Sequence, residues 1–127
     1  MRSNLRARVV AEFVGTAFLV AAVVGSGIMA ERLSGGNVAL ALLANTIATG
    51  AALVALILTF GPISGAHFNP VVSIADAIEG GLAWAETPAY VLAQISGGMS
   101  GRFWLTRCSR FRWSLRRTVF AVDRLSY

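Results

Sequence analysis

Two long apolar runs occupy the first half of the chain and indicate its class. Residues 9–29 are apolar apart from Glu12 and a few small side chains, and residues 38–60 carry no charge. At 1.5 Å per residue, a helix over the second run reaches about 35 Å, enough to cross a hydrocarbon core of about 30 Å. Lipid offers the backbone no hydrogen-bond partner, so each run must be helical. The pattern predicts two transmembrane helices.

The arginines before the first run predict its orientation. Arg2, Arg6 and Arg8 precede it, and positive residues beside a span favour the cytoplasmic side. We therefore expect a multi-pass protein of the plasma or inner membrane, with a cytoplasmic N-terminus and the turn at residues 31–36 outside. A cleaved signal peptide fits less well, because the apolar run is too long and residues 28–30 (IMA) make a poor cleavage site.

A short apolar segment follows the second run. Residues 61–65 (GPISG) are typical of a helix break. Asn69 is a good N-cap, Pro70 suits the first helical position, and the apolar residues after them stop at residues 80–81. A helix of about ten residues is too short to cross a bilayer, and irregular backbone survives at membrane depth only inside protein or beside a water-filled cavity. Residues 61–78 are therefore predicted to form a re-entrant loop and half-helix.

A third apolar run, residues 88–101, gives way to a basic tail. The run contains small residues that suit close helix packing in lipid (Ala93, Ser96, Gly97, Gly98, Ser100 and Gly101). Residues 1–101 carry four arginines and five acidic residues, a net charge of −1, whereas residues 102–127 carry seven arginines and Asp123, a net charge of +6. Only 13% of the chain is charged, against about 25% in soluble domains. The composition favours a lipid-facing body.

Two motifs give the chain a resemblance to a known family. Residues 11–16 (AEFVGT) open the first run, and residues 64–71 (SGAHFNPV) lead into the short helix. Together they resemble the first repeat of the major intrinsic protein family, the aquaporins and glycerol facilitators, over residues 8–101. The resemblance implies an all-α membrane protein, the first half of an inverted-repeat channel fold with one re-entrant half-helix. The predicted spans cover residues 9–29, 38–60 and 88–101 onward.

The chemistry of the loop suits a channel for small neutral solutes. The N-terminus of the short helix carries a partial positive charge that opposes cations and protons. Asn69 can offer an amide donor, and an extended backbone over residues 65–67 can present a row of carbonyl acceptors. The resemblance assigns the same roles to this region. The predicted pore and selectivity residues are Gly65, Ala66, His67, Asn69, Pro70, Val71 and Thr49.

Three polar residues in or near the loop motif and the first span also have structural interpretations. Glu12 is a charge within a span and hence a functional candidate. The resemblance implies that it accepts hydrogen bonds from the loop backbone, and the alternative is that it reaches cytoplasmic water. His67 is interpreted as a buried, hydrogen-bonded strut, because no second ligand accompanies it for a metal. Asn69 taken alone would only cap a helix, but the motif favours a place in the pore.

Two positions bear on selectivity through the resemblance. Thr49 lies twenty positions before Asn69, where the family takes one residue of its outer filter and where water- and glycerol-conducting members carry an aromatic residue. The small side chain predicts a wider filter. Val71 replaces the alanine of the family's Asn-Pro-Ala motif. Both features resemble a bacterial subgroup associated with the transport of arsenic compounds.

The second repeat of the family is absent from this sequence. Asn-Pro occurs once, and no asparagine follows Asn69. Family members are tetrameric, and here another chain would have to supply the second repeat. An inverted copy is disfavoured by the N-terminal arginines. We expect passive transport of small neutral solutes (water, glycerol or metalloid hydroxides), incomplete in this chain. The alternatives are a transport-dead membrane fragment and a small membrane protein with a basic surface helix.

The basic tail, residues 102–127, does not share the resemblance. We interpret it as the product of a shifted reading frame or a truncation near codon 101. Trp104, Phe111, Leu115 and Val122 would share one face of a helix, which is the basis of the surface-helix alternative. Nucleic-acid binding is disfavoured beside two spans. Because no nucleophile–base pair, metal-ligand spacing or cofactor motif occurs, we expect no enzyme, metal or cofactor.

Overall fold

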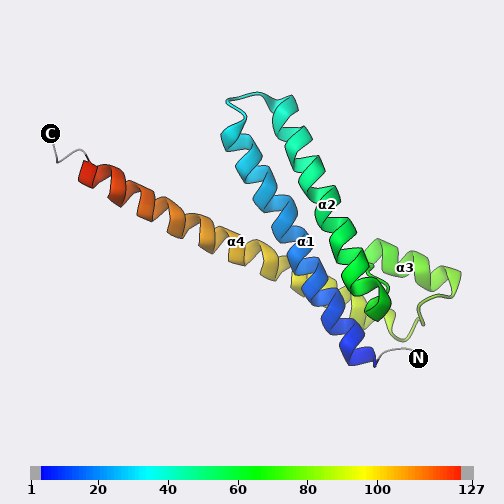
Figure 1. The fold of residues 1–127 in the computed structure, drawn as a ribbon. Coiled ribbons are helices and arrows are strands. Elements are labelled where there is room, and N and C mark those ends of the chain that lie inside the picture. Colours follow the sequence, from blue (N-terminus) through cyan, green and yellow to red (C-terminus); the bar gives the residue numbers. More distant parts are fainter. Residues whose placement is uncertain (1–3, 124–127) are drawn as a thin grey trace.

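The computed structural model describes the backbone of residues 4–123 and the side chains of residues 4–107. This part of the chain contains four helices and no strand: α1 (Leu5–Leu33), α2 (Val38–Ser64), α3 (Pro70–Glu79) and α4 (Thr87–Asp123) (Figure 1). By length and composition, α1 and α2 are able to cross a membrane. The predicted all-α class is confirmed.

Asparagine caps set the starts of the first two helices. The Asn4 side chain accepts a hydrogen bond from the amide of Arg6 (3.3 Å), so α1 begins ahead of its predicted start. Asn37 caps α2 in a similar way, through the amide of Leu40 (3.1 Å). These side-chain oxygens satisfy amides that the first turn of a helix leaves without a partner.

The end of α2 differs from the prediction. The sequence predicts a break from Gly61 onward, whereas α2 continues through Pro62 to Ser64. Proline removes one backbone hydrogen bond, but the last turn still closes, because the Gly65 amide donates to the Gly61 carbonyl (3.0 Å). The helix stops at Gly65, whose φ of 94° lies in the left-handed region. The predicted start of the loop is therefore wrong, and the irregular segment shortens to residues 65–69.

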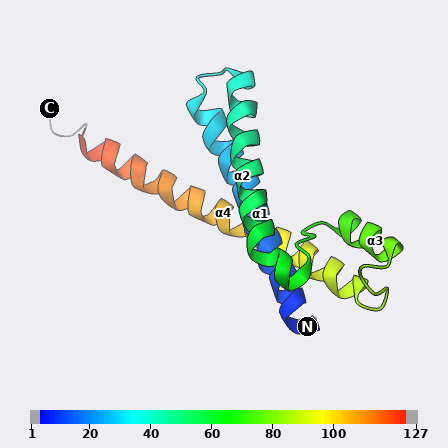
Figure 2. The ribbon, with the colours of Figure 1, turned by 45° about the vertical axis from the view of Figure 1, so that its right-hand side comes forward.

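Helix α1 lies at the centre of the arrangement. It runs side by side with α2 as an antiparallel hairpin and contacts α4, which crosses it, while α3 packs on α4 (Figures 1 and 2). The C-terminal part of α4 projects away from the hairpin (Figure 1). A small buried cluster of Ala77, Leu82 and Tyr90, with Val9 packed against it, joins α3 and α4 to the beginning of α1.

Two glycines of α4 allow it to approach α1 closely. A Cβ added at Gly97 would overlap the carbonyl oxygen of Phe13, and a Cβ added at Gly101 would overlap that of Ala17. Any larger side chain would therefore push the helices apart. Close approach through small residues four positions apart is typical of helix pairs in membranes. The crossing fixes the position of α4 along α1, as the small residues of the third apolar run predict.

Helix α4 continues without interruption from the third apolar run into the basic tail. Its backbone is helical through Asp123, so residue 101 is not the end of a helix. The side chains of residues 108–127 lie outside the described residues, and with them most of the predicted apolar face of the tail. The boundary at residue 101 and its origin in a shifted frame or a truncation stay predictions.

Helix α2 leaves most of its surface open. Ser64 is its one buried residue, and large apolar side chains along it are exposed, including Leu42, Ile47, Val54 and Leu58. A soluble protein rarely exposes so continuous an apolar surface. In a membrane protein, such a face contacts lipid or further protein.

Candidate functional site: the loop before α3

Helix α3 begins at a capped turn. Asn69 has an extended backbone (φ −149°, ψ 128°), and its side-chain Oδ1 accepts a hydrogen bond from the Val71 amide (2.9 Å). Pro70 takes the first helical position, where no amide donor is needed. Because Oδ1 is engaged by the helix, the planar side chain of Asn69 directs its Nδ2 donor away from the cap, and the residue is exposed.

Glu12 of α1 holds the loop that leads to α3. Its carboxylate is fully buried and accepts hydrogen bonds from the backbone amides of His67 (3.0 Å) and Phe68 (2.7 Å). It also accepts from the Ser64 hydroxyl (2.6 Å) and the Gln94 side-chain amide (2.8 Å), so that each oxygen has two donors. A charge buried in a span is costly unless it is hydrogen-bonded. The burial contradicts the alternative that Glu12 reaches water.

The same contacts set the direction of the loop carbonyls. In a trans peptide the C=O of one residue points opposite to the N–H of the next, and the described chain has no cis peptide. Because the amides of residues 67 and 68 point toward Glu12, the carbonyl oxygens of Ala66 and His67 point away from it. Two acceptors therefore lie on the face of the loop opposite its anchor.

The backbone of the loop is not extended. The prediction of an extended backbone over residues 65–67 is therefore wrong. Gly65, Ala66 and Phe68 have φ angles of 94°, 53° and 50°, all in the left-handed region. Glycine adopts this conformation freely, whereas alanine and phenylalanine do so at a cost of roughly 1–2 kcal/mol each. Successive amides of an extended chain alternate in direction. Two neighbouring amides can reach one carboxylate only if the chain turns between them.

His67 links the loop to α3. Its Nδ1 lies 3.1 Å from the Ser73 hydroxyl, and its Nε2 lies 3.5 Å from the Asp76 carboxylate. The ring is largely buried and lies near the ring of Tyr90, with 5.5 Å between centroids. Sequence reasoning missed the Asp76 contact, because it depends on how α3 folds back over the loop. Any direct action of His67 on a solute stays a prediction.

Phe68 and Gln94 also belong to the site, and sequence reasoning missed both. Phe68 is buried, and a Cβ added at Gly15 of α1 would overlap its ring. The ring lies edge-on to Phe60, with 6.1 Å between centroids. Gln94 of α4 donates to Glu12 and to the Ser73 hydroxyl, both at 2.8 Å. Gly15 was the available signal for Phe68, because a glycine on a buried face leaves room for a ring.

The structure does not bring all the predicted site residues together. The start of α3 holds Asn69, Pro70 and Val71, which Phe68 separates from residues 65–67. Thr49 lies near the middle of α2 and is half-buried. Within the described residues, no Cα atom of α2 lies within 8 Å of one in α3. The selectivity roles of Thr49 and Val71 stay predictions.

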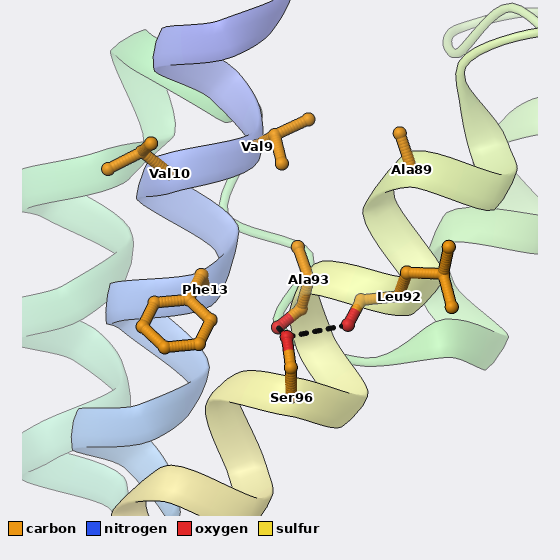
Figure 3. A pocket seen from close by; sticks show the side chains of 7 residues that line it. All are labelled: Val9, Val10, Phe13, Ala89, Leu92, Ala93 and Ser96. Carbon is orange, nitrogen blue, oxygen red and sulfur yellow. Dashed lines mark hydrogen bonds between the residues drawn. The ribbon is translucent and has the colours of Figure 1, made fainter.

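An apolar groove between α1 and α4 lies apart from the loop. It is lined by Val9, Val10, Phe13, Ala89, Leu92, Ala93 and Ser96 (Figure 3). The hydroxyl of Ser96, the polar side chain of this lining, already bonds the carbonyls of Leu92 (2.8 Å) and Ala93 (3.1 Å) within its own helix. The groove thus offers a polar solute little hydrogen bonding, and the loop is the better candidate site.

Known proteins resemble this chain in sequence. The chain matches the family described as Major intrinsic protein over residues 1–121, a range that includes both motifs and most of the basic tail. It is 57% identical over 98 residues to the aquaglyceroporin AqpS of Rhizobium meliloti (strain 1021). This match covers 77% of this chain and 42% of that protein. No solved structure matches the chain significantly.

Two further relatives come from a plant and a bacterium. The probable aquaporin NIP7-1 of Arabidopsis thaliana is 43% identical over 89 residues, or 70% of this chain and 31% of that protein. The glycerol uptake facilitator protein of Streptococcus pneumoniae (strain ATCC BAA-255 / R6) is 35% identical over 103 residues. This match covers 74% of this chain and 41% of that protein. The chain thus spans less than half the length of each relative. It belongs to the major intrinsic protein family of integral membrane channels.

Proposed function

We propose that this chain forms one wall of a passive channel for small neutral solutes, with the start of α3 facing the solute path. The orientation of the polar groups around the loop carries the proposal. On one face of the loop, Glu12 accepts hydrogen bonds from the backbone amides. The carbonyls of Ala66 and His67 and the side-chain donor of Asn69 remain for the other face. Water, glycerol and similar hydroxylated solutes both donate and accept hydrogen bonds, so they can exchange hydration water for these groups.

The short helix supports selection against charge. The N-terminal end of α3 carries a partial positive charge from the aligned peptide dipoles of the helix. A cation or a hydrated proton near Asn69 meets this field, whereas a neutral solute does not. The proposed path therefore favours uncharged solutes without requiring an ionised side chain.

The small side chain of Thr49 supports solutes larger than water. Thr49 and Val71 stand where the resemblance places filter and motif residues, and Thr49 is smaller than the aromatic residue of water- and glycerol-conducting members. Glycerol and metalloid hydroxides are of the appropriate size and polarity. The printed names of two relatives, an aquaglyceroporin and a glycerol uptake facilitator, support the same solute class.

A single copy of this chain provides only one wall. Helix α2 is open along most of its length, and Asn69 is exposed. We propose that further protein, such as another chain, covers this face in a conducting channel. By itself the 127-residue chain would insert into the plasma or inner membrane with a cytoplasmic N-terminus and would not conduct.

A chimera tests the channel role. Residues 1–101 replace the matching region of the Rhizobium relative, and stopped-flow light scattering follows glycerol entry into proteoliposomes. We expect flux clearly above empty vesicles for the chimera and none for the 127-residue chain. Asn69→Ala should lower the flux of the chimera, whereas Ile78→Ala, at the exposed far end of α3, should not.

Each outcome of the chimera experiment has a definite meaning. A correctly inserted chimera without flux, or one in which Asn69→Ala has no effect, would contradict the channel role. Flux through the isolated chain would contradict the proposal that a second wall is required.

A further inference from the structure

We propose that Arg8, Glu86 and Tyr90 form a clasp that positions the re-entrant loop. This inference deepens the function proposed above and rests on it, because the loop is the proposed wall of the path. Arg8 lies near the start of α1, Glu86 directly precedes α4, and Tyr90 lies in the first turn of α4. They act through Ser64 and do not touch the proposed path themselves.

The arginine fork joins the other two members of the clasp. Arg8 Nη1 donates to Glu86 Oε2 (2.7 Å), and Arg8 Nε donates to the Tyr90 hydroxyl (2.8 Å). The guanidinium carbon lies 5.3 Å from the centroid of the Tyr90 ring. The side chains of Arg8 and Glu86 are only 12% and 27% exposed, so solvent screens this pair less than a surface ion pair. A planar guanidinium fixes both bonds at once.

The tyrosine transmits this contact to the end of α2. Tyr90 is fully buried, and its hydroxyl donates to the carbonyl oxygen of Ser64 (2.8 Å). A hydroxyl has one proton, so the bond to Ser64 uses the donor and the bond from Arg8 uses an acceptor position. The sequence of bonds therefore has one direction, from Arg8 to Tyr90 to Ser64. The carbonyl of Ser64 belongs to the last turn of α2, where backbone acceptors lack helical partners.

Ser64 is the point at which the clasp reaches the loop. Its carbonyl is held by Tyr90, and its hydroxyl donates to Glu12 (2.6 Å) and accepts from the Ala66 amide (3.1 Å). The chain therefore leaves α2 in one fixed direction, and the next residues turn toward Glu12. Without the clasp, the peptide unit of Ser64 and Gly65 is held only by the bond from the Gly65 amide to the Gly61 carbonyl (3.0 Å). The orientation of the Ala66 carbonyl, one of the two proposed acceptors, would then depend on Glu12 alone.

Thiol labelling of the loop tests the clasp independently of transport. In a Cys108→Ser background, Ala66→Cys supplies a single thiol, and a water-soluble maleimide reports its labelling rate in proteoliposomes of the full chain. Tyr90→Phe and Arg8→Gln should each raise the rate about fivefold, the order expected for one lost hydrogen bond. Because both act on the same bond to Ser64, the double variant should label no faster than the faster single variant. Arg6→Gln removes the same charge from an exposed position and should change nothing.

The result also separates a positioning role from general support. An unchanged rate in Tyr90→Phe, or effects of Tyr90→Phe and Arg8→Gln that multiply in the double variant, would overturn the clasp. If Arg8→Gln does not fold, Arg8→Lys keeps the charge but lacks the planar fork, and it should still label faster than the parent. A parent-like rate for Arg8→Lys would equally overturn it. If the chimera shows no flux but Tyr90→Phe and Arg8→Gln raise the labelling rate as expected, the channel role is contradicted and the clasp is supported.

Discussion

Replacing Glu12 by glutamine keeps the shape of the side chain and removes half of its acceptors. The carboxylate accepts four hydrogen bonds, whereas glutamine has one acceptor oxygen and an NH₂ group that only donates. The Ser64 hydroxyl can turn to accept, and the Gln94 amide can rotate. The backbone amides of His67 and Phe68 have no such freedom. At least one of them is therefore left without an acceptor.

The expected size of this effect follows from that count. A buried donor without a partner costs about 1–3 kcal/mol, and the bonds that remain lose their charge assistance. Local opening of the loop should therefore become easier by about 2 kcal/mol, or about 30-fold in its equilibrium constant. Hydrogen–deuterium exchange of the amides at residues 67 and 68 in detergent measures this opening directly. We expect exchange about 30-fold faster in Glu12→Gln.

The amide of Leu40 provides the control. It bonds the side chain of Asn37 at the opposite end of α2 (3.1 Å), so its exchange should not change. Parent-like exchange at residues 67 and 68 would refute the anchoring role of Glu12. Faster exchange everywhere, at Leu40 included, would refute the local reasoning, because the substitution would then have loosened the whole bundle.

Three further predictions test packing, backbone conformation and selectivity. Gly101→Val should weaken the contact between α1 and α4 by about 1–3 kcal/mol, because its side chain would overlap the α1 backbone. Thermal unfolding in detergent measures this loss of stability. Gly50→Ala is the control and should be nearly neutral, because Gly50 has open space around it. Gly65→Ala should destabilise the turn by about 1–2 kcal/mol, because φ is 94° there, and exchange of the neighbouring amides should report it. Thr49→Phe in the chimera should reduce glycerol flux more than water flux; an equal reduction of both would contradict a filter role for this position.

The sequence by itself determined the features that depend on neighbouring residues. Long apolar runs have to be helices in lipid, so the two spans could be located from composition alone. The start of α3 was equally local, because Asn69 caps an amide only two positions away and Pro70 fits the first turn. The end of α2 was placed too early, because proline signals a lost hydrogen bond, and only the φ of Gly65 shows where the helix stops.

Only the tertiary structure showed which groups bond Glu12 and on which face of the loop the carbonyl oxygens lie. The partners of Glu12 lie 52 to 82 positions away in the sequence, and Arg8 meets Glu86 78 positions away. These contacts form because the glycines of α4 let it cross α1 at backbone distance. The small residues of the third apolar run predict a close helix contact, but they do not identify the helix that α4 contacts. Two amides bond one carboxylate, and this turns the backbone left-handed and directs its carbonyls to the opposite face. Residues adjacent in the sequence do not determine this conformation.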